Sequence, residues 1–172
     1  MPVPPPVSVQ NRLCLSCGLC CNGVLFGDVK LQAEDNPALL HKLGLSIQKA
    51  RFKQPCAALD GCRCKIYSDR PAYCRKFECL LLKRVQAGHL DPEQALMTIK
   101  AARDQIDSVT RLLRSLGDQN EVVPLQLRFR NISRKFEKAA LSKSQAHDFA
   151  ELTQEMHALN LLLGDQFLPD PA

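Results

Sequence analysis

The sequence predicts a mostly α-helical protein in which an irregular cysteine-rich half with short strands packs against a C-terminal bundle of about three helices. Two observations lead to this prediction. All nine cysteines lie between Cys14 and Cys79. After them, apolar residues recur every three or four positions, which is the period of an amphipathic helix. A chain of 172 residues is long enough to bury a sizeable core.

Three amphipathic helices are expected in the second half of the chain. The first begins at Asp91-Pro92, because Asp is a favoured N-cap and proline suits the first helical position. Its apolar stripe continues until Gly117, a helix-ending residue. Two more helices are expected over residues 129–139 and 144–164, the last with Ser144 as its N-cap. Together they would form an antiparallel bundle, or a hairpin plus a helix.

The signals for secondary structure are weaker in the cysteine-rich half. Residues 24–26 and 29–31 are expected to form short strands on either side of a turn. A short helix is expected over Pro37–Lys42, with an Asn-Pro start. Residues 51–67 have no helical period and are expected to form an irregular loop. A helix is then expected from about Pro71 to Gly88.

These signals divide the chain into three parts. Residues 1–11 are proline-rich and are expected to be a flexible arm. Residues 12–88 would form the cysteine region and residues 89–168 the helical region, with a frayed tail over Leu168–Ala172. The cysteine region has few large apolar residues, so we expect it to share one domain with the helices.

Several protein classes are not expected from the composition. No apolar run approaches the roughly 20 residues of a membrane span, and the N-terminus does not resemble a signal peptide. We therefore expect a cytoplasmic protein without a membrane partner. Reducing conditions there keep cysteines as thiols, so a dense cysteine pattern predicts metal binding or catalysis rather than disulfides.

The positive charge is concentrated in two stretches. Residues 51–84 hold nine Lys and Arg residues and three acidic ones, and nearby cations would lower thiol pKa values and offset the charge of a thiolate–metal centre. A solvated basic face is the alternative. Residues 128–143 are also basic, but the chain has no Trp and few aromatic residues to stack bases. We therefore favour a solvated helix face there over a nucleic-acid surface.

The first cysteine group has the spacing of metal ligands. Cys14-x-x-Cys17 and Cys17-x-x-Cys20 overlap, and each pair places two sulfurs on one side of a turn. The same spacing matches the first three ligands of a bacterial-type [4Fe–4S] site. Cys21 follows Cys20 directly, and adjacent side chains diverge. Cys21 is therefore expected either to bind a second metal or to pack.

The second cysteine group is Cys56, Cys62, Cys64 and Cys74. Cys62 and Cys64 would lie on one side only if the segment is extended. Cys74 would lie near a helix N-terminus, which stabilises a thiolate. Cys79 is expected to face away from Cys74 on the same helix. For Cys62 and Cys79, a ligand and a packing residue both remain open.

These cysteines and their neighbours resemble a known family. The sequence Cys14-x-x-Cys17-Gly-x-Cys20-Cys21, then Pro55-Cys56, then Cys64-x-Ile-Tyr67-x-x-Arg70-Pro-x-x-Cys74 resembles the YkgJ-like cysteine-cluster family of zinc- or iron-chelating domains. The resemblance covers about Cys14 to Cys79. It implies seven metal ligands: Cys14, Cys17, Cys20, Cys21, Cys56, Cys64 and Cys74.

A related domain in flagellin lysine methylases is associated with an iron–sulfur cluster. This distant similarity favours an iron–sulfur cluster or iron here, with zinc as the alternative. The helical half does not resemble the methylase, so methyl transfer is not implied. Tyr67 and Arg70 could line the cofactor site, Tyr67 by packing over it and Arg70 by offsetting thiolate charge. Their alternative role is to anchor the loop.

Three functions are consistent with this pattern. The site could hold an iron–sulfur or other iron centre with a redox-related role. Zinc could instead be structural, with the helical half binding a protein partner. The protein could also store or deliver metal. Thiolate ligands suit both zinc and iron–sulfur clusters, so the ligand chemistry leaves the metal open. No histidine has zinc-finger spacing, and no residue is predicted to be catalytic.

Overall fold

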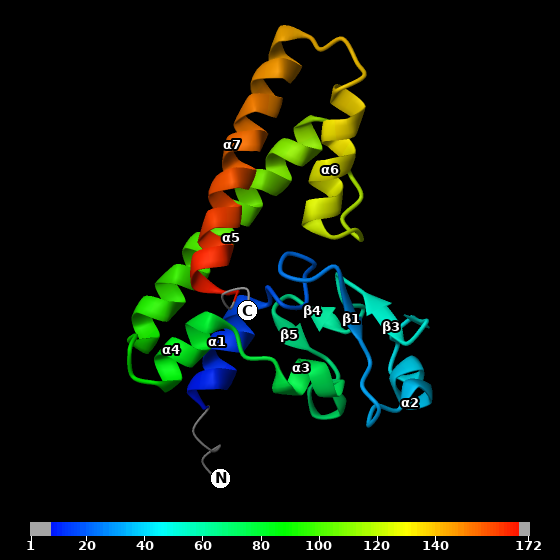
Figure 1. The fold of residues 1–172 in the computed structure, drawn as a ribbon, viewed down its shortest axis with the longest axis vertical. Coiled ribbons are helices and arrows are strands. Elements are labelled where there is room, and N and C mark those ends of the chain that lie inside the picture. Colours follow the sequence, from blue (N-terminus) through cyan, green and yellow to red (C-terminus); the bar gives the residue numbers. More distant parts are fainter. Residues whose placement is uncertain (1–7, 169–172) are drawn as a thin grey trace, which may run out of the picture.

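A computed structural model describes residues 8–168 of the chain. Within that range it is mostly helical and has a few short strands. Figure 1 shows a tall helical part above two smaller parts, one built around α1 and α4 and the other around the strands. The helices are α1 (Val9–Cys17), α2 (Pro37–Lys42), α3 (Ala72–Lys76), α4 (Leu80–Gln86), α5 (Pro92–Ser115), α6 (Leu125–Phe136) and α7 (Lys143–Gln166), with a 3₁₀ turn, η1, over Tyr67–Asp69.

The predicted fold class is confirmed, and the three C-terminal helices form the tall part. α5 and α7 lie side by side in opposite directions, and α6 covers one end of the pair (Figure 1). Asp91 caps α5 by accepting a hydrogen bond from the Glu93 N–H. The apolar stripe of α5 is buried as its period predicts, including Ile99, Val109 and Leu113.

The third helix begins earlier and ends later than the sequence predicts. Ser142, not Ser144, is the N-cap of α7. Its side chain accepts from the Gln145 N–H, while the Gln145 side chain accepts from the Ser142 N–H. This reciprocal capping box satisfies two backbone donors, which selects Ser142 over Ser144. Gly164 lies inside the helix, which continues to Gln166.

The strands form two small antiparallel sheets. One has the order β1-β3-β2, with β1 at Asp28–Lys30, β3 at Arg51–Lys53 and β2 at Ile47–Gln48. The other pairs β4 (Leu59–Asp60) with β5 (Arg63–Cys64). The irregular loop expected over 51–67 is thus partly wrong, because three short strands lie within it.

The strand expected over residues 24–26 is also wrong. This segment belongs to a turn, in which the Val24 N–H bonds the Asn22 side chain and the Leu25 N–H bonds the Leu19 carbonyl. An Asn side chain that binds the backbone two residues on competes with strand pairing.

The helix expected over Pro71–Gly88 is two helices. α3 ends at Lys76, Phe77 has an extended conformation, and α4 begins after Cys79. The Phe77 ring packs edge-on against Phe26, with the ring centroids 4.9 Å apart. The Leu80 N–H donates to the Phe167 carbonyl at the end of α7. These two tertiary contacts hold the chain where it leaves the helical path.

The N-terminal arm also differs from its expected bounds. Helix α1 begins at Val9, within the range 1–11, and Ser8 caps it by accepting from the Asn11 N–H. Residues 1–7 of the expected arm, and most of the expected frayed tail, lie outside the described residues.

The buried apolar residues form two clusters. The helical core joins α5, α6 and α7 to residues of α1 and α4, such as Leu13 and Leu81. The sheet core is smaller and contains Val29, Phe52 and Ile66. The cysteine stretch therefore lies between two packed units. No helix within residues 8–168 is long and apolar enough to cross a membrane.

Candidate metal centre

Eight of the nine cysteines line one cavity of about 110 Å³ between the two cores. Its other lining residues are mostly apolar or aromatic, such as Phe26, Leu82 and Ile99. All nine cysteines are free thiols. The cysteines in the lining are Cys14, Cys17, Cys20, Cys21, Cys62, Cys64, Cys74 and Cys79.

Helix α1 and its C-terminal turn position the first cysteine group. Cys14 and Cys17 lie on the last turn of α1, and Gly18 ends that helix with a φ of 72°. A left-handed residue at this place is usually glycine, because a Cβ is costly there. The turn is closed by the N–H groups of Cys21 and Asn22, which both donate to the Gly18 carbonyl.

The second cysteine group lies on three different elements next to the sheet core. Cys56 precedes β4, Cys64 is on β5, and Cys74 is in the middle of α3. All three pack against the sheet core. The Cys56 N–H donates to the Cys21 carbonyl at 2.7 Å, which ties this group to the first one.

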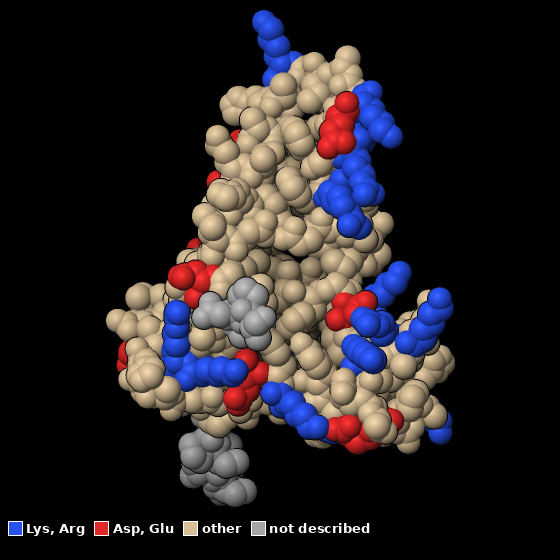
Figure 2. Space-filling view, in the orientation of Figure 1, with Lys and Arg blue, Asp and Glu red and all other residues tan. Residues whose placement is uncertain are grey.

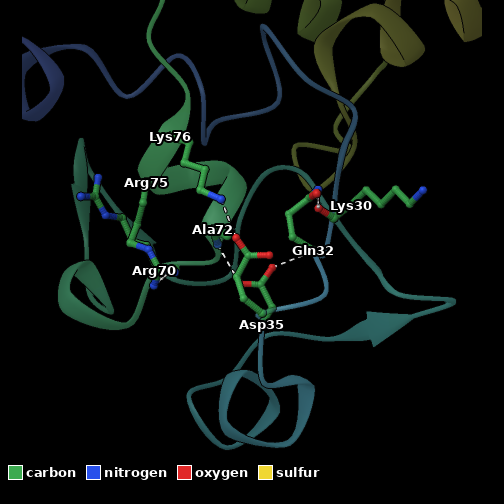
Figure 3. Close-up of polar contacts among 8 residues, drawn as sticks. Lys30, Gln32, Asp35, Arg70, Ala72, Arg75 and Lys76 are labelled. Carbon is green, nitrogen blue, oxygen red and sulfur yellow. Dashed lines mark hydrogen bonds and ion pairs between the residues drawn. The ribbon is translucent and has the colours of Figure 1, made fainter.

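Asp35 holds the helix that carries Cys74 (Figure 3). Its carboxylate accepts from the Ala72 N–H at 2.7 Å and from the Gln32 N–H at 2.7 Å. Ala72 is fully buried at the first position of α3. The carboxylate therefore satisfies an end-of-helix donor that water cannot reach. The Lys76–Glu34 ion pair in the same figure is exposed.

Burial favours the protonated form of several thiols on the cavity in the metal-free chain. Burial raises the pKa of Cys17, Cys21 and Cys74 to about 12, and it raises the pKa of Cys20 well above its ordinary value. Neighbouring thiols add to each rise, because a second thiolate repels the first. A metal cation would reverse this preference, since only the thiolate is a ligand.

The structure places Tyr67 and Arg70 on the cavity and joins them to each other. The Arg70 guanidinium lies 3.6 Å from the centre of the Tyr67 ring, and its Nε donates to the Tyr67 carbonyl. The Tyr67 hydroxyl bonds the Asn11 side chain on α1. Arg70 opposes the rise in pKa that burial causes at Cys21 and Cys74. Both residues thus also anchor the loop, which was the alternative role.

The two cysteines left open by the sequence have different surroundings. Cys79 precedes α4 and packs against the helical core beside Cys17. It is not on the same helix as Cys74, contrary to the expectation. The Cys62 sulfur bonds the guanidinium of Arg103 on α5, and Arg103 also donates to the Cys17 carbonyl at 3.3 Å. The sequence gives no signal for Arg103, because the contact is long-range.

The donor set fits a thiolate-bound metal. No His, Asp or Glu lines the cavity, and the four histidines are exposed. Among residues 8–168, no group of three or more His, Cys, Asp or Glu side chains is already arranged to hold one ion. The sulfurs therefore lie around the cavity and do not converge on one position.

These features define a cysteine-cluster metal-binding protein. A comparison with protein families matches residues 13–101 to the CxxCxxCC family, described as "Putative zinc- or iron-chelating domain". The chain belongs to this family, as the resemblance in the sequence predicts. No curated protein and no solved structure matches the chain. Metal chelation by the cysteine-rich region is thereby supported, with zinc and iron both consistent with the family.

Proposed function

We propose that thiols of the cysteine-rich region hold an iron–sulfur or other iron centre with a redox-related role. The observation that supports this best is the arrangement of eight cysteines around one mainly apolar cavity. A single zinc ion needs its sulfurs at about 2.3 Å, so four of them converge tightly. In a [4Fe–4S] cluster each thiolate binds a different iron, so the ligands surround a larger group.

The surroundings are suited to such a centre. An iron–sulfur cluster would supply one-electron transfer, at a potential that depends on its charge, hydrogen bonds and solvent exposure. Arg70 and Arg103 lie beside the thiols and would offset their negative charge when ionised. Apolar side chains, including Leu82, Ile99 and Phe167, line the cavity beside the thiols.

The test is anaerobic purification followed by measurement of iron, zinc and acid-labile sulfide. We expect a brown protein that contains iron and sulfide and absorbs broadly near ~400 nm, as thiolate-bound clusters do. The Cys74→Ser variant should lose this absorbance, and a variant of an exposed residue far from the cavity, His157→Ala, should keep it. A colourless protein with stoichiometric zinc would contradict the proposal.

A structural zinc centre is the second candidate. One observation favours it: the sheet core is small, so thiols bound to one metal would hold α1, β5 and α3 together. In this case the helical half would bind a protein partner. Figure 2 shows Lys and Arg side chains gathered over α6 on the face in view, a surface suited to an acidic partner. Metal storage or delivery, the third function, would require the fold to persist after the metal leaves.

A further inference from the structure

Cys20 and Cys21, which are adjacent in the turn after α1, have different surroundings. The side chains of Cys20 and Cys21 must diverge, as those of adjacent residues do. The chain then binds the second cysteine group through the Cys21 carbonyl, which accepts the Cys56 N–H at 2.7 Å. Cys21 is thus next to Cys56, while Cys17, three residues before Cys20, packs against the helical core.

We propose that the cysteine region holds two four-thiolate centres, divided between Cys20 and Cys21. Centre A would be bound by Cys14, Cys17, Cys20 and Cys79. Centre B would be bound by Cys21, Cys56, Cys64 and Cys74. The proposal deepens the proposed function and rests on it for the identity of the metal, but the number of centres is a separate question.

The packing of the thiols supports this division. Cys17 and Cys79 both pack against the helical core, where α1 and α4 meet α5. Cys56, Cys64 and Cys74 all pack against the sheet core. Cys17 and Cys79 therefore lie on one unit of the molecule, and Cys56, Cys64 and Cys74 lie on the other.

Spacing and one backbone contact complete each set. Cys14, Cys17 and Cys20 follow one another at intervals of three residues along α1 and its C-terminal turn. Cys21 is tied to the other set, because its carbonyl accepts the Cys56 N–H.

The ninth cysteine has a different partner. The Cys62 sulfur bonds Arg103 and lies 3.8 Å from the Cys17 carbonyl. The site of a Cβ on Gly18 is 3.5 Å from the Cys62 sulfur, so α1 closes over this residue. Cys62 therefore lines the cavity without belonging to either set. Cys62→Ser is a matched control, because it removes a cavity thiol and leaves both proposed sets complete.

The experiment counts metal in single-set variants of the full chain. Wild type, Cys79→Ser, Cys56→Ser and Cys62→Ser are purified anaerobically, and bound metal per folded chain is measured with circular dichroism as the check on folding. We expect Cys79→Ser and Cys56→Ser each to retain about half of the wild-type metal, their double variant to retain none, and Cys62→Ser to retain all. Loss of all metal from a folded single variant, or no loss from Cys79→Ser, would overturn the proposal.

A cobalt titration gives the number of metal centres even if a variant loses the wild-type metal for another reason. Cobalt(II) is added to the reduced, metal-free chain, and the thiolate-to-cobalt charge-transfer band is followed. We expect saturation at two equivalents for wild type and for Cys62→Ser, and at one for Cys79→Ser and Cys56→Ser. Saturation of wild type at one equivalent would overturn the two-centre proposal. Zinc in the purified protein would contradict the iron proposal alone, since this count is independent of the native metal.

Discussion

Gly18 is the residue on which the geometry of the first cysteine group depends. It is left-handed, and a Cβ built on it would lie 3.3 Å from the Cys62 Cα. Gly61 is also left-handed, with a φ of 58°, but a Cβ there would meet nothing within 4 Å. Substituting each glycine therefore separates the free-energy cost of the left-handed backbone from the cost of the contact with Cys62.

Gly18→Ala should therefore destabilise the protein more than Gly61→Ala. Each substitution places a Cβ in the left-handed region, which costs roughly 1–2 kcal/mol. Gly18→Ala must also move α1 away from Cys62, so we expect a further loss and weaker metal retention. Urea unfolding of both variants measures the difference. Equal losses for the two variants would show that the contact with Cys62 does not matter.

The raised thiol pKa values predict how the stability of the metal-free chain depends on pH. Cys17, Cys21 and Cys74 have folded pKa values of about 12, against an ordinary value of 9.0. Between these values the folded state holds more protons than the unfolded state, so the free energy of unfolding falls as pH rises above about 9. Below pH 9 these thiols are protonated in both states, and their contribution is constant.

The measurement is urea unfolding of the reduced, metal-free chain at pH 8 and at pH 10. We expect a lower midpoint at pH 10 for wild type. A variant with Ala at positions 17, 21 and 74 is the control for other groups that titrate in this range, and it should lose less stability between the two pH values. The same loss in both proteins would contradict the assignment of the effect to these thiols.

At the scale of elements, Asp35 shows how a loop positions a ligand-bearing helix. Asp35→Ala would leave the buried Ala72 N–H without its acceptor, at a cost of about 1–3 kcal/mol. Because α3 carries Cys74, we also expect part of the bound metal to be lost. Glu34→Ala is the matched control, since Glu34 is adjacent and exposed and pairs with exposed Lys76. Unfolding midpoints and metal content are measured for both, and equal effects would refute a positioning role for Asp35.

A second prediction concerns the attachment of α6. Arg128 on α6 is 5% exposed and its Nε donates to Asp118 at 2.6 Å. Asp118→Ala leaves this cation buried and unpaired, which typically costs 3–5 kcal/mol. Arg130→Ala removes an exposed charge from the same helix and should change stability little. Thermal unfolding compares the two, and a small effect of Asp118→Ala would mean that α6 detaches without the rest of the fold.

The elements also show which features the sequence predicts. The starts of α2 and α5 were predictable because Asn36 and Asp91 are local caps followed by proline. The break between α3 and α4 was not, because Phe77 leaves the helix to reach Phe26, a contact between distant residues. The start of α7 was missed because two serines compete, and only Ser142 has a Gln three residues later.

In the candidate site, too, the features set by neighbouring residues were predictable and those set by long-range contacts were not. The spacing of Cys14, Cys17 and Cys20 indicated local ligands, and the structure places all three on one cavity. The grouping of Cys79 with them depends on how α1 and α4 both pack against α5, which no spacing reveals. Arg103 was missed for the same reason, since it reaches Cys62 from a helix 41 residues further along the chain.

At the scale of the whole molecule, the two apolar cores predict an uneven response to metal removal. The helical core contains α5, α6 and α7 together with parts of α1 and α4, so it does not need metal to stay packed. The sheet core has few members and short strands, and the thiols of Cys56, Cys64 and Cys74 lie directly on it. Metal binding energy would therefore act as folding energy mainly on the sheet side.

Removal of the metal by a chelator under reducing conditions should therefore destabilise the sheet core and leave the helical core packed. We expect the amides of β1, β3, β5 and α3 to lose protection from hydrogen exchange, while those in the middle of α5 and α7 keep theirs. Most of the far-ultraviolet helical signal should remain, because the longest helices belong to the helical core. Cys62→Ser, which leaves both proposed thiolate sets complete, should behave as wild type before and after chelation. Loss of protection throughout the chain in a single step would show that the two cores fold as one unit with the metal, and unchanged protection everywhere would show that the metal does not stabilise the fold.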